Sequence, residues 1–258
     1  ALYATLHPDD GHHKWQVRKA CLESLRRIGY QVGTGDMIGP PGQTLGDLAD
    51  DILLYRDMDI DMIGMGPYVV HHNTPIGKAV LASGMDSKEE QKRRLEMGLK
   101  MIAVTRLFLP DVNIAATTAL QALHPLGREL GLKAGANVLM PIVTVPKFRP
   151  QYLLYDNKPC VDEVPEQCKN CISARVASVG DTIGFGQWGR FAALFPSQVK
   201  GFEPTRAYAN PAYRYIKKAG PVGTCFFVWR KGWDSNPRCV AASLVFKTSS
   251  LNHSDTFP

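Results

Sequence analysis

Three cysteines fall close together near the end of the regular part of the chain. Cys160, Cys168 and Cys171 are spaced C-x7-C-x2-C in a stretch that is also rich in Asp, Glu and Lys. Thiolates at this spacing suit an iron–sulfur cluster or zinc in a reducing compartment better than a disulfide framework. Only three protein ligands are visible, so the fourth position would hold water, another residue or nothing. Three free surface thiols are the alternative.

Two adjacent histidines, His71 and His72, are a second set of side chains able to bind metal. Neighbouring histidines rarely share one ion, and no carboxylate lies at a spacing that would complete a site. The sequence therefore argues against a metal site at this pair.

The charge of the chain is concentrated in its last part. Residues 196–258 carry nine Lys/Arg and three Asp/Glu, which accounts for the whole net charge of +6, whereas the first 195 residues carry 21 of each sign. A neutral folded part argues against a nucleic-acid partner. No run of 18 apolar residues appears, so no membrane span is expected.

Short strands alternate with helices in the first 140 residues. Helices are expected at residues 12–28, after Thr44 (an N-cap with Asp47 three residues on), at 88–109 and at 120–132. Strands are expected at 31–32, 61–66, 112–116 and 136–140. This alternation predicts an α/β fold with a parallel sheet. Half of an eight-unit barrel and an open sheet both fit the count.

The regular pattern stops at about residue 195. We therefore expect a folded region at 1–195 and a disordered or non-native tail at 196–258, where Ser, Thr and Asn dominate the end. Ala1 is not a start methionine, so we expect the native N-terminus and its targeting information to be missing.

A series of motifs, in order along residues 2–190, resembles the HydE family of [FeFe]-hydrogenase maturases. The motifs are Leu6-His-Pro-Asp9, Gly29-Tyr-Gln-Val-Gly-Thr-Gly35, Met37-Ile-Gly-Pro-Pro-Gly-Gln-Thr44, Asp61-Met-Ile-Gly-Met-Gly-Pro67, Ile114-Ala-Ala-Thr-Thr-Ala119, Gly135-Ala-Asn-Val-Leu-Met-Pro141 and the cysteine triplet. Biotin synthase shares the barrel and part of the biotin and thiamin synthesis-associated region, but is expected to lack the late cysteines.

The resemblance implies a radical S-adenosylmethionine enzyme with a TIM-barrel-type (βα)8 fold, of which this chain would be the C-terminal half with an irregular tail. Active sites in such barrels lie at the C-terminal ends of the strands. The family holds a catalytic [4Fe–4S] cluster on a CxxxCxxC loop, and the open iron of this cluster binds S-adenosylmethionine. No CxxxCxxC occurs in this chain. We therefore expect the chain alone to be inactive.

The resemblance also assigns roles to individual residues. It implies that Arg18 binds the methionine carboxylate of S-adenosylmethionine, for which the guanidinium fork is suited; a surface arginine is the alternative. The cavity wall and substrate contacts would come from six residues, several of which ordinary packing would also explain: Thr117, Thr118, Met140, Arg149, Tyr152 and Tyr155. Cys160, Cys168 and Cys171 would hold an accessory cluster, often [2Fe–2S].

The expected function is assembly of the [FeFe]-hydrogenase active-site cluster, with a small or organometallic substrate and other maturation proteins as partners. A biotin-synthase-like sulfur-inserting enzyme and a non-catalytic iron–sulfur-binding fragment are the alternatives. The expected location is the cytoplasm, or the chloroplast stroma if the source is an alga.

Overall fold

Short parallel strand segments form the centre of the molecule. A computed structural model describes residues 2–142, 144–161, 165–184 and 226–230, with the backbone alone at 152, 165–169 and 226–230. β1 (Gly33–Thr34) pairs with β3 (Met62–Ile63), and β3 pairs with β5 (Asn113–Ile114), all in parallel. β6 (Val138–Leu139) joins beside β5 through a parallel bridge between Ala115 and Val138.

Two further segments lengthen the first two strands. β2 (Met37–Ile38) follows β1, β4 (Gly66–Pro67) follows β3, and the two pair in parallel. Each strand therefore lies beside the strand of the unit before it, in the order β1-β3-β5-β6. The predicted α/β class with a parallel sheet is confirmed. A consecutive strand order is compatible with a TIM-barrel-type fold, whereas a doubly wound sheet reverses its order at a switch point.

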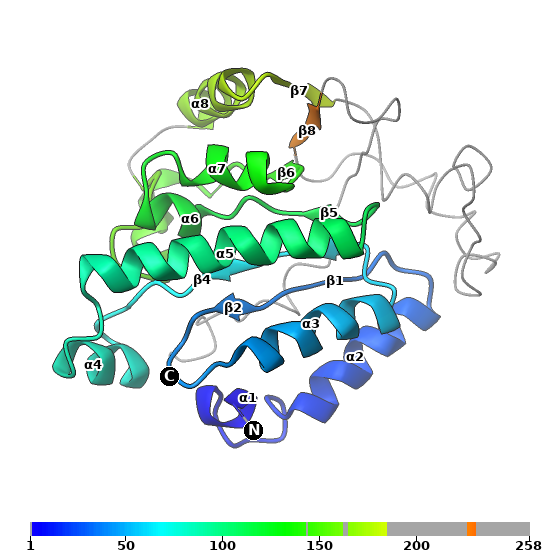
Figure 1. The fold of residues 1–258 in the computed structure, drawn as a ribbon, viewed down its shortest axis with the longest axis vertical. Coiled ribbons are helices and arrows are strands. Elements are labelled where there is room, and N and C mark those ends of the chain that lie inside the picture. Colours follow the sequence, from blue (N-terminus) through cyan, green and yellow to red (C-terminus); the bar gives the residue numbers. More distant parts are fainter. Residues whose placement is uncertain (1, 143, 162–164, 185–225, 231–258) are drawn as a thin grey trace.

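The helices follow one another in the same sense as the strands. Figure 1 shows them in chain order from α2 at the bottom, through α3 and α5, to α7 and α8 at the top. Their bounds are α1 Leu2–Leu6, α2 Trp15–Arg27, α3 Leu45–Asp57, α4 Pro75–Ala82, α5 Lys88–Phe108, α6 Thr118–Leu123, α7 Gly127–Ala134 and α8 Pro165–Ser178, with a 3-10 helix η1 at Pro146–Tyr152.

The predicted helix ends are close to the observed ones, with one exception. Thr44 caps α3 as expected, because its hydroxyl accepts from the Asp47 N–H while the Asp47 carboxylate accepts from the Thr44 N–H. The single helix predicted at 120–132 is wrong, because the chain forms α6 and α7 there. Pro125 lies between them, and a proline inside a helix removes a hydrogen bond and clashes with the preceding turn.

Two glycines allow neighbouring strands to touch. A Cβ placed on Gly35, between β1 and β2, would lie 1.8 Å from the carbonyl oxygen of Gly64, between β3 and β4. Gly64 itself has open space, with nothing within 4 Å of its own Cβ position. A side chain at Gly35 would therefore push the two strands apart at the point where both are interrupted.

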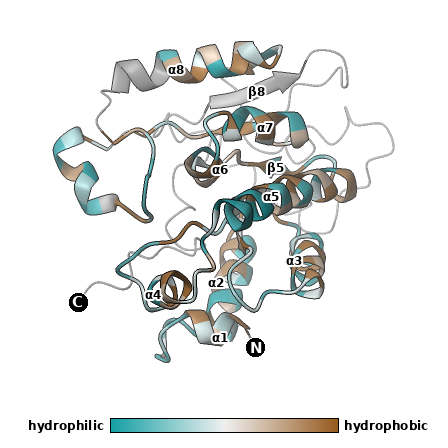
Figure 2. Ribbon diagram, turned by 60° about the vertical axis from the view of Figure 1, so that its left-hand side comes forward, coloured by the Kyte–Doolittle hydropathy of each residue, from teal (hydrophilic) through white to brown (hydrophobic). Residues whose placement is uncertain are grey.

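Apolar side chains from strands and helices form one main core. Ile38, Ile63, Met65, Ile114 and Leu139 are fully buried in it. In Figure 2 the long helix α5 changes from teal in its first half to brown in its second half. Arg94 is nevertheless buried in the polar half, and Met101 and Ile102 in the apolar half.

An antiparallel element lies beyond the parallel strands. β8 (Phe226–Arg230) pairs with β6 on one side and β7 (Asp181–Gly184) on the other. Five residues of the predicted tail thus form a strand, and the remainder of 196–258 lies outside the described residues. In the part of the chain that the structure describes, no helix is long and apolar enough to cross a membrane.

Candidate functional site

A cleft of about 740 Å³ opens at the C-terminal end of β1, between α1, α2 and one side of α3. This cleft is lined by polar and aromatic side chains from the chain segments around these three helices and from the segment that joins β1 to β2. Among them are Tyr3, His7, Arg18, Asp36, Asp51 and Tyr55. The predicted S-adenosylmethionine contact, Arg18, is therefore placed in a cleft at the end of the sheet where barrel active sites lie.

Arg18 lies in the first turns of α2 and faces α1. Its guanidinium group hydrogen-bonds to the Tyr3 hydroxyl, and the Tyr3 ring stacks on His7 with 3.8 Å between ring centroids. Burial raises the pKa of Tyr3, and the charge of Arg18 opposes that rise. The side chain is thus held by the wall of the cleft, unlike a solvated surface arginine.

Acidic groups form another wall of the same cleft. The Tyr55 hydroxyl donates to the Asp36 carboxylate over 2.8 Å. Burial raises the pKa of Asp36 to about 6, and burial together with the charge of Asp36 raises the pKa of Asp51 to about 7. A guanidinium and ionisable carboxyl groups in one cleft offer complementary partners for a small zwitterionic ligand.

Two of the predicted substrate residues meet in a second cluster. The Tyr155 hydroxyl, from the loop after η1, donates to the Thr118 hydroxyl over 2.5 Å. Thr117 lies beside it as the N-cap of α6, and its buried hydroxyl has no hydrogen-bond partner among the described residues. A Cβ on Gly66 would come within 2.6 Å of this hydroxyl, so glycine is required for Thr117 to pack there.

Arg128 belongs to the same cluster and was missed by the sequence interpretation. This residue, at the start of α7, is only 2% exposed, and its Nε and one Nη have no hydrogen-bond partner in the described part of the chain. Its positive charge lowers the pKa of Tyr155 against the raising effect of burial. A charge without a partner is costly to bury, so Arg128 marks a place for an anion. Nothing in the Gly127-Arg128-Glu129 sequence distinguishes it from a surface residue.

Arg149 forms hydrogen bonds that hold the loop carrying Tyr155 and Cys160. Its Nε donates to the Thr144 carbonyl over 2.8 Å and one Nη donates to the Cys160 carbonyl over 2.9 Å. Met140 is half-buried directly after β6. The Tyr152 side chain lies outside the described residues. The predicted substrate contacts of these three residues stay predictions.

The cysteine triplet is divided between a loop and a helix. Cys160 lies in the loop with a φ of 65°, and Cys171 lies on α8, one turn after Cys168. Arg175 donates to the Cys171 sulfur over 3.3 Å and to the Glu129 carboxylate over 2.7 Å. The Cys168 side chain lies outside the described residues, so the metal site at this triplet stays a prediction.

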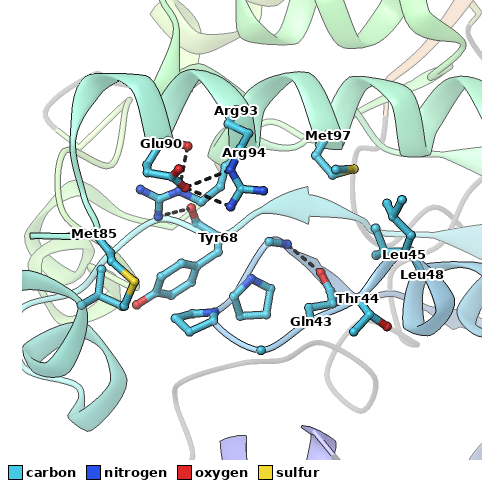
Figure 3. A pocket seen from close by; sticks show the side chains of 15 residues that line it. Gln43, Thr44, Leu45, Leu48, Tyr68, Met85, Glu90, Arg93, Arg94 and Met97 are labelled. Atoms are coloured by element: carbon cyan, nitrogen blue, oxygen red, sulfur yellow. Dashed lines mark hydrogen bonds and ion pairs between the residues drawn. The ribbon is translucent and has the colours of Figure 1, made fainter. Parts of the chain in front are cut away.

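Another cleft, of about 490 Å³, adjoins the first one at Pro40 and Gln43, which line both, and its lining includes none of the predicted site residues. It is bounded by the loop after β2 and by the beginning of α5. Figure 3 shows Tyr68 between Met85 and that loop, with Arg94 above it. Arg94 donates to the Tyr68 carbonyl over 3.1 Å, forms an ion pair with Asp86, and lies 5.4 Å from the Tyr68 ring centroid. The Arg94 guanidinium group therefore already has partners within the protein.

Comparison with known proteins identifies the relatives of the chain. The [FeFe] hydrogenase maturase subunit HydE of Thermotoga maritima is 40% identical over 194 residues, which are 75% of this chain and 51% of that protein. The chain is a relative of HydE. The resemblance expected from the motifs is thereby confirmed.

The HydE-like chain also resembles biotin synthases, more distantly. The proteins of Trichodesmium erythraeum and of a Synechocystis species are 29% and 30% identical over 128 residues, which are half of this chain and about a third of each enzyme. No protein-family model matches the chain. The chain spans about half the length of HydE.

Proposed function

We propose that this HydE-like chain supplies four βα units of a radical S-adenosylmethionine barrel, whose complete form acts as a maturase of the [FeFe]-hydrogenase cluster. Two observations support this proposal. The chain matches half of HydE at 40% identity, and its parallel strands follow one another in the consecutive order of a barrel. Closure would require further strands beside β1, whose other edge is unpaired among the described residues.

The observation that carries the proposal is the cleft that contains Arg18. Its guanidinium would bind the carboxylate of S-adenosylmethionine, and Tyr3 would keep the guanidinium in place. Asp36, which becomes ionised above a pH of about 6, would attract the positively charged part of the ligand. The donor set therefore fits the amino-acid end of S-adenosylmethionine.

The second cluster would bind the small or organometallic substrate. The hydroxyls of Thr117, Thr118 and Tyr155 offer hydrogen bonds, and Arg128 offers a positive charge. Such a set suits a carboxylate or another anion. Other maturation proteins would be the partners that receive the product.

The catalytic [4Fe–4S] cluster does not fit the residues of this chain. None of its six cysteines lies in a CxxxCxxC loop, so no step of the reaction is assigned to them. We therefore expect no cleavage of S-adenosylmethionine by the isolated chain. Cys160, Cys168 and Cys171 remain candidates for an accessory [2Fe–2S] cluster.

Binding of S-adenosylmethionine to the 258-residue chain tests the proposal. In calorimetric titration, Arg18→Ala should weaken binding about ten- to hundredfold, because one charge-assisted contact to a carboxylate is lost. Lys19→Ala is the matched control, since Lys19 lies on the same helix in an exposed pair with Glu23. Equal affinity of the wild-type and Arg18→Ala proteins would refute the role of the cleft.

A biotin-synthase-like activity is the second candidate, supported by the two enzymes that match half of the chain. Saturable binding of biotin that is lost in Thr118→Val would favour it. A non-catalytic iron–sulfur fragment would instead show cluster absorbance from the cysteine triplet and no binding of S-adenosylmethionine.

A further inference from the structure

The structure brings a carboxylate to the adjacent histidines that the sequence left without one. His71 and His72 lie between β4 and α4, and Asp156 lies in the loop after η1. One ring nitrogen of each histidine and one Asp156 oxygen all lie within 4.8 Å of one another. Among the described residues, this is the one group of three such side chains that is so arranged.

The hydrogen bonds of His71 leave one ring nitrogen as an acceptor. The Asn73 N–H donates to Nδ1 over 3.1 Å, so Nδ1 carries a lone pair and the proton is on Nε2. That Nε2–H group then donates to the Leu153 carbonyl over 2.9 Å. In metal-binding histidines the far N–H is typically bound to a carbonyl, as Nε2–H is here, and a metal ion at Nδ1 would take the place of the Asn73 N–H.

His72 and Asp156 face each other across the two loops. The His72 Nδ1 lies 2.8 Å from one Asp156 oxygen, and the His72 backbone N–H donates to the other oxygen over 3.3 Å. The carboxylate is therefore oriented by the backbone of the residue whose ring it meets. A divalent ion would take the place of the proton that these two atoms share, because metal binding requires deprotonated ligands.

We propose that His71, His72 and Asp156 bind a divalent transition-metal ion. Two imidazole nitrogens and one carboxylate oxygen are ligands that Zn²⁺, Co²⁺ and Ni²⁺ accept, with water completing the coordination. His72 and Asp156 are 60% and 39% exposed, so an ion can enter from solvent without opening the fold.

Binding at this site would fix the loop that carries a substrate residue. Asp156 directly follows Tyr155, and its own N–H donates to the Val70 carbonyl over 3.1 Å. A metal ion bound by three ligands on two loops would therefore hold Tyr155 against Thr118 more firmly than the hydrogen bonds of Asp156 to Val70 and His72 do alone. The site would be distinct from the cysteine triplet in both its residues and its ligand atoms.

The test uses the full chain with all six cysteines replaced by Ser, which removes the competing thiolates. Zn²⁺ calorimetry and the visible absorption of Co²⁺ should show one saturable site with nitrogen and oxygen ligands. His72→Ala with Asp156→Asn should weaken Zn²⁺ binding by at least about tenfold. The melting temperature should rise with Zn²⁺ in the cysteine-free chain and not in this double variant.

A similar motif elsewhere in the chain supplies the control. His13 contacts Asp10 over 2.7 Å and follows another histidine, His12, but these residues do not bring three ligand atoms together. His13→Ala with Asp10→Asn should leave Zn²⁺ affinity unchanged. Absence of saturable binding in the cysteine-free chain would overturn the proposal, as would equal affinity after substitution of His72 and Asp156.

Discussion

The Tyr155 hydroxyl donates to the Thr118 hydroxyl over 2.5 Å, across 37 positions of sequence. This bond joins the loop after η1 to the first turn of α6. The burial that raises the pKa of Tyr155 also excludes the water that would replace Thr118. The pair is therefore a direct link between the cysteine-bearing loop and the predicted substrate residues.

Removing this bond should destabilise the chain by a measurable amount. Tyr155→Phe should lower the free energy of unfolding by about 0.5–1.5 kcal/mol, and Thr118→Val by about 1–3 kcal/mol because it leaves the buried tyrosine hydroxyl without a partner. Denaturant unfolding of both single variants and of the double variant gives the coupling energy. Fully additive losses would show that the two hydroxyls do not interact.

Arg128 should destabilise the protein when no anion is bound. Arg128→Met keeps the aliphatic bulk and removes a buried charge that lacks partners among the described residues, so we expect a gain of about 1–4 kcal/mol in the free energy of unfolding. Added phosphate should raise the melting temperature of the wild type more than that of the variant. A loss of stability in Arg128→Met would mean that the guanidinium is paired within the protein.

Gly35 and Gly64, which lie between the paired strand segments, allow a matched comparison. Gly35→Ala places a methyl group 1.8 Å from the Gly64 carbonyl oxygen, so β1 and β3 must separate, and we expect a loss of about 3 kcal/mol or more. Gly64→Ala meets open space and should change the free energy of unfolding by less than about 1 kcal/mol. Similar losses in the two variants would contradict this close approach.

Asp36 should make stability depend on pH. Burial raises the pKa of Asp36 to about 6 in the folded protein, whereas the ordinary pKa of a free aspartate side chain is 3.8. The folded state therefore binds more protons between these values, and the free energy of unfolding falls as the pH rises through them. Asp36→Asn stays neutral and still accepts from Tyr55.

The Asp36→Asn variant should thus be more stable than wild type at pH 8, by up to about 3 kcal/mol, and equal to it at pH 3. Urea unfolding across this range measures the difference. A constant difference at all pH values would show that the effect is not electrostatic.

Local patterns predicted the elements better than they predicted the contacts between them. The cap formed by Thr44 and Asp47 was readable because both partners lie within four residues. The split between α6 and α7 was signalled by Pro125, but apolar residues on both sides of it continued the helical pattern. Arg18 was assigned through the resemblance, and the structure places it in a cleft.

The missed parts of the site depend on burial and on distant pairs. Arg128 is an ordinary helix residue by its pattern, and only the packing of α7 shows that its charge is buried. Asp156 lies 84 positions from His72, so no local spacing connects it to the histidines. Such relationships arise from the arrangement of the units and not from any one segment.

The consecutive order β1-β3-β5-β6 has a consequence for how the chain acquires its structure. Each new parallel strand finds its partner in the unit that was synthesised just before it, as Met62 does with Gly33 and Asn113 does with Met62. Loop closure between such neighbours costs little entropy compared with pairing across the whole chain. The sheet can therefore be assembled strand by strand from its N-terminal side while the ribosome is still adding residues.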